Sequence, residues 1–248
     1  MGRMRALRSD HKSYWLTDGA VLAAALSVTT VGRLLNRRVV EPRCFPCDDG
    51  TINALDRWTP HWHSRSLEVL SYVAEIAALA TPVVNSVRVD GLSRTLWADL
   101  LICGEVVSLN AAANIVVKTL VARPVPRVYT PLFPELQRES RGYGSFYSGH
   151  CAHTTGALAA NAVLGHLRGD RHIWPWTALS LGTAIVSITR VGAGRHFFTD
   201  ALAGSLVGAT IGSLVPWLRQ RGRSRPGGRA AAAELYFIGH RVLERMVT

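Results

Sequence analysis

Apolar residues are gathered into six stretches of about twenty residues, and polar connectors separate them. The stretches are residues 14–35, 67–87, 95–117, 151–167, 173–189 and 200–218. A helix needs about 20 consecutive apolar residues to cross the hydrocarbon core of a bilayer. The pattern therefore predicts an all-α fold, a bundle of six transmembrane helices.

The six stretches differ in how many charges they carry. Residues 173–189 and 201–218 contain no charged side chain, so we expect them to be the clearest spans. The first three stretches contain the carboxylates Asp18, Glu75, Asp99 and Glu105. Carboxylates are costly inside a membrane and should face the bundle interior or lie at a helix end. Because these four carboxylates would be costly in a bilayer, a soluble all-α bundle remains the alternative fold.

Glycine recurs at every fourth position of the last stretch, as Gly204, Gly208 and Gly212. This spacing places the three glycines on one face of a helix. Small residues on one face let a second helix approach closely. We interpret the repeat as a packing surface.

Two connectors are long, 36–66 and 118–149, and the second contains four prolines, so it is not helical throughout. With a cytoplasmic N-terminus, both connectors and the 190–199 turn face outward. The expected organisation is a basic cytoplasmic N-terminus (1–13), a six-helix membrane domain (14–218) and a basic cytoplasmic tail (219–248). The inner segments hold 15 Arg and Lys residues and the outer ones 13, so the charge bias alone does not fix the orientation.

Composition supports a membrane protein over a nucleic-acid-binding one. The chain is 48% hydrophobic and 18% charged, against about 25% charged in soluble proteins. Its net charge of +11 favours an anionic partner. The basic residues flank apolar stretches, and no basic stripe is interleaved with aromatic residues, so we expect a membrane surface and not nucleic acid.

The four cysteines do not form a disulfide scaffold or a zinc site. Cys103 and Cys151 stand singly in apolar surroundings, as buried thiols do. Cys44 and Cys47 form a C-x-x-C motif without the second pair that a zinc site requires. The motif is either a local disulfide on an oxidising face, which we prefer, or two free thiols. No metal and no cofactor is expected.

Two short motifs carry the candidate chemistry. Ser148, Gly149 and His150 open the fourth apolar stretch, and Arg190, His196 and Asp200 follow in the pattern R-x5-H-x3-D. Both motifs stand at ends of apolar helices that the topology places on one side of the membrane. The sequence therefore predicts that they form one site.

These residue types suit phosphoryl transfer. The transition state spreads negative charge over three oxygens, which the hydroxyl of Ser148, the backbone N–H groups at Gly149 and the guanidinium of Arg190 can stabilise. Asp200 lies four residues after His196, so its carboxylate could hold one imidazole nitrogen while the other attacks phosphorus. His150 is the candidate acid for the leaving group.

Other histidines fit a simpler role. A single histidine in an apolar segment is more often a hydrogen-bonded core residue than a catalyst. We therefore expect His61, His63, His153 and His166 to be structural. Arg190 alone could likewise be a helix-terminal cation, and only its combination with the two histidines and Asp200 indicates a site.

On these motifs the chain resembles the type 2 phosphatidic acid phosphatase (PAP2) superfamily, which includes bacterial acid phosphatases and vanadium haloperoxidases. The family motif S-R-x5-H-x3-D corresponds to Thr189–Asp200, with threonine in place of serine, and P-S-G-H corresponds to Tyr147–His150. The resemblance covers residues 95–218. It implies six spanning helices in a bacterial inner membrane and a metal-independent site that faces the periplasm or extracytoplasmic side.

The first family motif, K-x6-R-P, is matched less well. Lys118 begins it, but the arginine position is Val125, followed by Pro126. The resemblance implies that Lys118 contacts phosphate, and only two of the chain's 28 cationic residues are lysines. Arg123 is the preferred replacement for the missing arginine, and Arg127 is the other candidate.

The resemblance implies a lipid phosphatase that uses phospho-His196. Phosphatidic acid, phosphatidylglycerophosphate, polyprenyl (di)phosphate and lipid A phosphates are all candidate substrates. Residues 146–150 are also somewhat similar to sphingolipid head-group synthases, so a lipid phosphotransferase is the alternative. A vanadate-dependent peroxidase is disfavoured by the apolar stretches. The alternative that is not an enzyme is a non-catalytic membrane protein that serves as a binding module.

Overall fold

The computed structural model describes residues 11–44, 47–92 and 94–224. The described residues form helices and loops, without strands. Six helices are long: α1 (His11–Val39), α2 (Arg65–Asp90), α3 (Arg94–Val121), α5 (Gly149–Leu167), α6 (Trp174–Gly192) and α7 (Phe198–Ser224). The connectors contain the short α4 (Pro134–Gln137) and the 3-10 turns η1 (Asp49–Thr51), η2 (Pro126–Tyr129) and η3 (Ser140–Gly142). The all-α prediction is confirmed, and each long helix overlaps one predicted apolar stretch.

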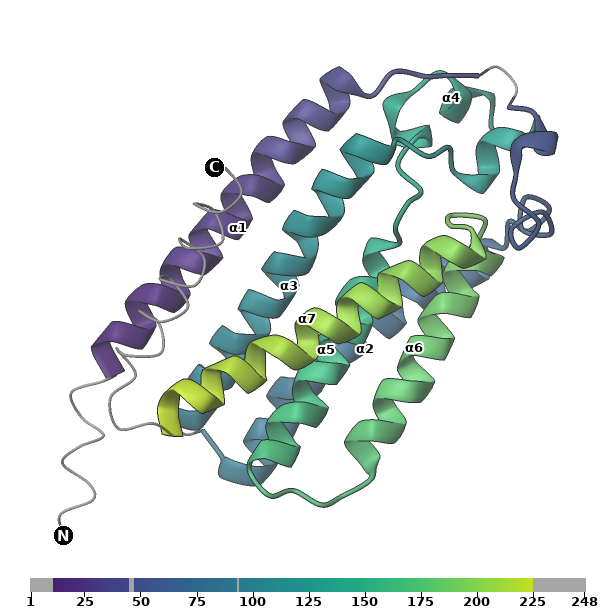
Figure 1. Cartoon of the computed structure of the whole chain (residues 1–248). Coiled ribbons are helices and arrows are strands. Elements are labelled where there is room, and N and C mark those ends of the chain that lie inside the picture. The colour runs from purple at the N-terminus through teal and green to yellow at the C-terminus, as the bar shows by residue number, and fades with distance from the viewer. Residues whose placement is uncertain (1–10, 45–46, 93, 225–248) are drawn as a thin grey trace, which may run out of the picture.

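Helix α5 lies at the centre of the bundle (Figure 1) and packs against α2, α3, α6 and α7. Most of its side chains are buried, and many are small. Helix α1 packs mainly on α3 at the edge of the bundle. The central position of α5 matters because its first residues carry the Ser-Gly-His motif.

The glycine repeat of α7 brings that helix against α5. A Cβ atom at Gly204, Gly208 or Gly212 would overlap the backbone of Ser148, Ala152 or Gly156, respectively. Only residues without a side chain allow this separation. The predicted close helix approach is confirmed, and it fixes the start of α5 beside the start of α7.

The carboxylates of the apolar stretches are buried and paired. Arg219 Nη1 lies 2.7 Å from Asp18 Oδ1, and Arg219 Nη2 lies 2.5 Å from Glu105 Oε1. Asp99 pairs with Arg168 at the end of the bundle far from α4. These carboxylates therefore face the interior or a helix end, as expected, and Arg219, near the end of α7, pairs with two of them.

Four segments of the described chain are long and apolar enough to cross a membrane: Leu16–Val39, Arg65–Arg88, Leu96–Tyr129 and Phe198–Arg219. Helix α6 is not among them, contrary to the expectation that residues 173–189 form one of the clearest spans. The helix begins at Trp174 and Pro175 and ends beyond Arg190, so its apolar part is short. Helix α5 is also absent from this set; its neighbours cover it, so it needs no continuous apolar surface.

The two long connectors fold into a packed cap at one end of the bundle. The Tyr143 hydroxyl lies within hydrogen-bond distance of the carbonyl oxygens of Cys44 (3.0 Å) and Gln137 (2.8 Å) and can donate its one proton to either, so it lies where the first connector meets the second. Cys44 and Cys47 are disulfide-bonded, as preferred from the sequence, and Cys103 and Cys151 are free. Residues 1–10 and 225–248, most of the two predicted cytoplasmic ends, lie outside the described residues.

Candidate active site

His196 lies in the short turn between α6 and α7, next to the connector cap. Its side chain is buried, and its Nδ1 lies 2.8 Å from the carbonyl oxygen of Ser145. A carbonyl can only accept a hydrogen bond, so Nδ1 carries the proton and Nε2 carries the lone pair. This is the tautomer that a nitrogen nucleophile requires.

Two cations without a carboxylate partner lie near His196. Arg190, in the last turn of α6, is 5% exposed; its Nη1 donates to Ser71 Oγ at 3.2 Å, and its Nε has no hydrogen-bond partner in the described chain. The aliphatic chain of Lys118, in the last turn of α3, runs beside Gly144, one residue before Ser145. No ion pair involving Arg190 or Lys118 is found among the described residues. Their charges are therefore available to an anion.

These neighbours affect the protonation of His196. Burial, together with the positive charges of Arg190 and Lys118, holds the pKa of His196 well below the ordinary histidine value, and His150 contributes in the same direction. Burial disfavours the charged ring, and like charges add to that effect. His196 is therefore neutral at physiological pH.

His150, in the first turn of α5, faces α2. Its ring makes an edge-to-face contact with Tyr72 at 4.9 Å between centroids, and Tyr72 also lies under the guanidinium of Arg190. His150 Nε2 lies 3.2 Å from Glu75 Oε2, an ion-pair distance that is not aligned for a hydrogen bond. Glu75 also contacts His153 Nδ1 at 3.1 Å. His150 is thus placed between the arginine and a carboxylate.

The start of α5 is locked to α7. Ser148 caps α5 by accepting from Cys151 N at 3.4 Å, and its own N–H donates to the Asp200 carbonyl at 3.0 Å. The Ser148 N–H is therefore not free for an anion, contrary to expectation, although its hydroxyl proton is. Gly149 lies against Asn114, where a Cβ atom would come within 3.0 Å of the amide oxygen.

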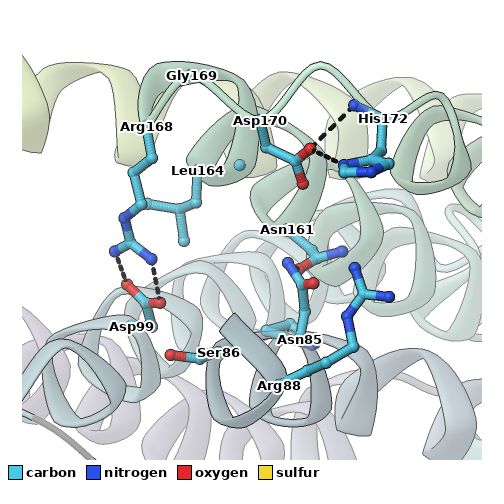
Figure 2. Close-up of a pocket in the computed structure, with 12 residues that line it drawn as sticks. Asn85, Ser86, Arg88, Asp99, Asn161, Leu164, Arg168, Gly169, Asp170 and His172 are labelled. Carbon is cyan, nitrogen blue, oxygen red and sulfur yellow. Dashed lines mark hydrogen bonds and ion pairs between the residues drawn. The ribbon is translucent and has the colours of Figure 1, made fainter. Parts of the chain in front are cut away.

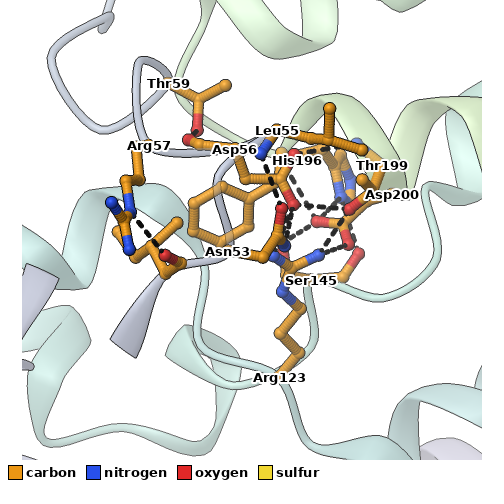
Figure 3. Close-up of polar contacts among 12 residues, drawn as sticks. Asn53, Leu55, Asp56, Arg57, Thr59, Arg123, Ser145, His196, Thr199 and Asp200 are labelled. Carbon is orange, nitrogen blue, oxygen red and sulfur yellow. Dashed lines mark hydrogen bonds and ion pairs between the residues drawn. The ribbon is translucent and has the colours of Figure 1, made fainter. Parts of the chain in front are cut away.

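Asp200 contacts His196 less directly than the sequence suggested. Asp200 Oδ2 lies 4.0 Å from His196 Nδ1, too far for a hydrogen bond. Its carboxylate instead accepts from Ser145 Oγ (2.5 Å), Phe197 N (2.9 Å) and Arg123 Nη1 (2.5 Å). Ser145 contacts both Asp200 and His196 (Figure 3), and Asp200 also holds the backbone N–H of Phe197, so the carboxylate positions the imidazole indirectly.

Arg123, the preferred replacement for the missing motif arginine, is neutralised by carboxylates. In addition to Asp200, it donates from Nη2 to Asp56 Oδ2 at 2.7 Å (Figure 3). Burial would raise the pKa of Asp56, but hydrogen bonds from Arg123 and Thr199 outweigh it and leave this pKa lowered. Asp56 is therefore ionised. In this structure the guanidinium of Arg123 ties the first connector to α7, and its role in binding phosphate stays a prediction.

Arg127, the other candidate, is also engaged. It donates to the Ala193 carbonyl at 2.8 Å and to Glu68 Oε2 at 2.7 Å, and Glu68 also pairs with Arg195. Both candidate arginines of the second connector are thus paired with carboxylates. Of the cations predicted to bind phosphate, Arg190 and Lys118 are those for which no ion pair is found within the described residues.

A cavity of about 350 Å³ lies next to this site. Its walls come from the start of α2 and from the second connector, and include Tyr72, which also contacts His150. The remaining lining residues are His63, Arg65, Glu68, Val69, Arg127 and Phe133. Tyr72 thus separates this cavity from His150.

Sequence reasoning missed several residues of this region. From the sequence, Glu75 is only a carboxylate that must avoid lipid, although a charged residue in an apolar helix also indicates a functional site. Ser145 and Asp56 lie in connectors without periodicity, so no pattern singled them out. Among the histidines expected in the core, His61 and His166 are exposed, and His153 lies beside the candidate site.

Comparison with known proteins places the chain in a family. Residues 99–224, just over half of the chain, match the family model described as the PAP2 superfamily. The protein therefore belongs to the PAP2 superfamily.

Among solved structures, the chain is similar to one described as the first transmembrane PAP2 type phosphatidylglycerolphosphate phosphatase from Bacillus subtilis. The identity is 21% over 84% of this chain and 95% of that one, with a TM-score of 0.47. No match was found among curated proteins.

Proposed function

We propose that the protein is an integral-membrane lipid phosphatase that forms a phosphohistidine on His196. The observation that carries this proposal is a difference in ion pairing among the cationic residues near the site. Arg123 and Arg127 pair with carboxylates, whereas no ion pair of Arg190 or Lys118 is found within the described residues, and both lie near a buried, neutral imidazole. Two unpaired cations beside a nucleophile suit a phosphate group, and membership of the PAP2 superfamily supports this chemistry.

In the proposed reaction, the lone pair of His196 Nε2 attacks phosphorus, and the bond from phosphorus to the lipid oxygen breaks. Arg190, Lys118, the Ser148 hydroxyl and the Gly149 N–H stabilise the charge on the phosphoryl oxygens. His150 protonates the departing alkoxide and then takes a proton from the water that releases phosphate. Glu75 supports the protonated form of His150 during these steps.

We propose six membrane spans, with α5 and α6 added to the four apolar segments, and a site that faces the extracytoplasmic side of the cell membrane. Six spans return the chain to the side on which it began. The disulfide in the first connector supports an oxidising location for that face. The organisation into 1–13, 14–218 and 219–248 is part of this proposal.

The substrate is a lipid phosphomonoester or diphosphate: phosphatidic acid, phosphatidylglycerophosphate, a polyprenyl (di)phosphate or a lipid A phosphate. The test is release of free phosphate from each of these by detergent-purified protein, with and without a chelator. We expect release from at least one lipid, undiminished by the chelator.

His196→Gln should lower the rate by at least about 10³-fold, because no nucleophile remains. The matched control is His61→Gln, an exposed histidine, which should keep the wild-type rate. Unchanged release in His196→Gln contradicts the nucleophile, and loss of activity with chelator contradicts the metal-independent mechanism. A new phospholipid in place of free phosphate identifies the phosphotransferase alternative.

A further inference from the structure

A second cavity, of about 290 Å³, lies at the opposite end of the bundle from His196 (Figure 2). The end of α2, the end of α5 and the α5–α6 loop form its walls, with Asp99 from the start of α3. Asn161, which lines the cavity, lies 11 residues after His150 on α5, a separation of about 17 Å along the helix axis. Nothing in the proposed reaction uses this cavity.

Two buried amides face each other in the cavity. Asn85 is 9% exposed and Asn161 is 3% exposed, and Asn85 Nδ2 donates to Asn161 Oδ1 at 3.2 Å (Figure 2). Asn85 Oδ1 and Asn161 Nδ2 have no partner in the described chain. Exchanging the oxygen and nitrogen of both side chains gives the same result, so one acceptor and one donor remain free in either orientation.

Ser86 adds a third free group. Its side chain lines the same cavity, is 3% exposed, and its Oγ has no hydrogen-bond partner among the residues described. A buried polar group left without a hydrogen-bond partner is unfavourable. Three such groups, two on α2 and one on α5, indicate that something polar occupies the space between them.

The charges at the mouth leave one cation available. Asp99 pairs with Arg168, and Asp170 accepts from the backbone N–H of His172 at 2.9 Å (Figure 2). Arg88 is exposed, lies 5.5 Å from the ring centre of Trp174, and forms no ion pair within the described part of the chain. A ligand thus meets hydrogen-bonding groups inside, and at the entrance it meets the guanidinium of Arg88 with the Asp170 carboxylate nearby.

We propose that this cavity binds a hydroxyl-bearing phosphate group. A hydroxyl both donates and accepts, so hydroxyls satisfy the free amide oxygen, the free amide NH₂ and Ser86 together. The phosphate then accepts from Arg88. A choline group has no N–H or O–H to donate, and an ammonium group cannot accept a hydrogen bond from Asn161. Neither group can therefore satisfy the free amide oxygen, the free amide NH₂ and the Ser86 hydroxyl together.

The group could belong to a lipid headgroup or to a free phosphorylated polyol. Native mass spectrometry of detergent-purified protein, titrated with phosphatidylglycerol and with phosphatidylcholine of the same acyl chains, tests the lipid source. Calorimetry with glycerol 3-phosphate tests the soluble source. We expect at least tenfold tighter binding of phosphatidylglycerol than of phosphatidylcholine, or saturable binding of glycerol 3-phosphate; whichever is found assigns the source.

The variant Asn85→Leu with Asn161→Leu tests the site itself. Replacing both partners by apolar groups of similar shape is close to neutral for stability, so the unfolding temperature should stay near that of the wild type. Binding should fall at least tenfold. Asn110→Leu is the matched control, because Asn110 is a buried amide that does not line the cavity. Arg88→Gln should weaken binding and reduce its dependence on salt.

Two results would overturn the proposal: equal binding of the two lipids together with no binding of glycerol 3-phosphate, or unchanged binding in the double leucine variant. Either one would indicate a cavity filled by water. If the double variant unfolds, Arg88→Gln decides the question, since an exposed arginine at the mouth can be replaced without loss of packing.

Discussion

At the scale of single residues, the arginines near the candidate site divide into those that hold the fold and those that are free to bind an anion. Arg123 joins the buried carboxylates of Asp56 and Asp200, whereas Arg190 contacts the Ser71 hydroxyl and the Tyr72 ring and forms no ion pair within the described residues. Removing one partner of a buried ion pair leaves the other charge uncompensated. The two arginines should therefore respond differently to the same substitution.

Arg123→Gln should lower the free energy of unfolding by about 3–5 kcal/mol, because two buried carboxylates lose their guanidinium. Arg190→Gln should leave stability near that of the wild type but reduce phosphate release by about 10²–10³-fold, the usual effect of losing one group that stabilises transition-state charge. Unfolding in detergent and phosphate release measure the two effects. Arg138→Gln, an exposed residue of the same connector, is the control. The reverse pattern would contradict the assignment of Arg190.

The protonation of His196 gives a prediction on pH. The neutral ring is the reactive form, and because its pKa is lowered well below the ordinary value of about 6.5, activity should persist at pH values below 6.5. Lys118→Met removes a nearby positive charge, which raises the pKa of His196 and moves the acidic fall in kcat/KM to higher pH.

Profiles of kcat/KM against pH for the two proteins on one substrate measure this shift, since the ionisation of the substrate is common to both. Lys118→Arg keeps the charge and should leave the acidic limb in place. An acidic limb that is the same in wild type and Lys118→Met would show that Lys118 does not act on His196.

At the scale of elements, the site depends on how closely α7 approaches α5. The glycine face of α7 lets the backbones meet, and this contact sets Ser148 against Asp200. A side chain on that face must push the helices apart. The helix pair is therefore the element on which the catalytic geometry rests.

Gly208→Ala should cost about 1–3 kcal/mol, since its Cβ atom would overlap the backbone of Ala152. The matched control is Gly19→Ala in α1, where a Cβ atom meets nothing within 4 Å; this change should leave stability equal or raise it by up to about 1 kcal/mol. Thermal unfolding of the two variants makes the comparison. Equal effects would mean that α5 and α7 are less tightly packed than the structure has them.

At the scale of the whole molecule, the proposed topology puts the connector cap and the second cavity on opposite faces of the membrane. Arg138 is exposed in the cap, and Arg171 is exposed in the α5–α6 loop at the other end. In intact cells, an impermeant maleimide should label Arg138→Cys and spare Arg171→Cys. Both should be labelled after the cells are opened. Labelling of Arg171→Cys alone in intact cells would reverse the orientation.

The sequence by itself determined the helices and the motifs. Apolar periodicity is a local property, so six stretches gave six long helices. The three motif residues also stay together in the fold, because Arg190 is in the last turn of α6, His196 lies in the short turn that follows, and Asp200 is in the first turn of α7. Membership of the PAP2 superfamily follows from the same linear patterns.

Tertiary structure decided which of these groups are free to react. Arg123 is chemically as suited to phosphate as Arg190, but it is paired with Asp56, which lies 67 residues away in a connector without periodicity. His196 is oriented by a carbonyl of the other connector rather than by Asp200, because hydrogen bonds depend on a few tenths of an ångström that spacing does not encode. The unpartnered amides of Asn85 and Asn161 come together only because α2 packs on α5.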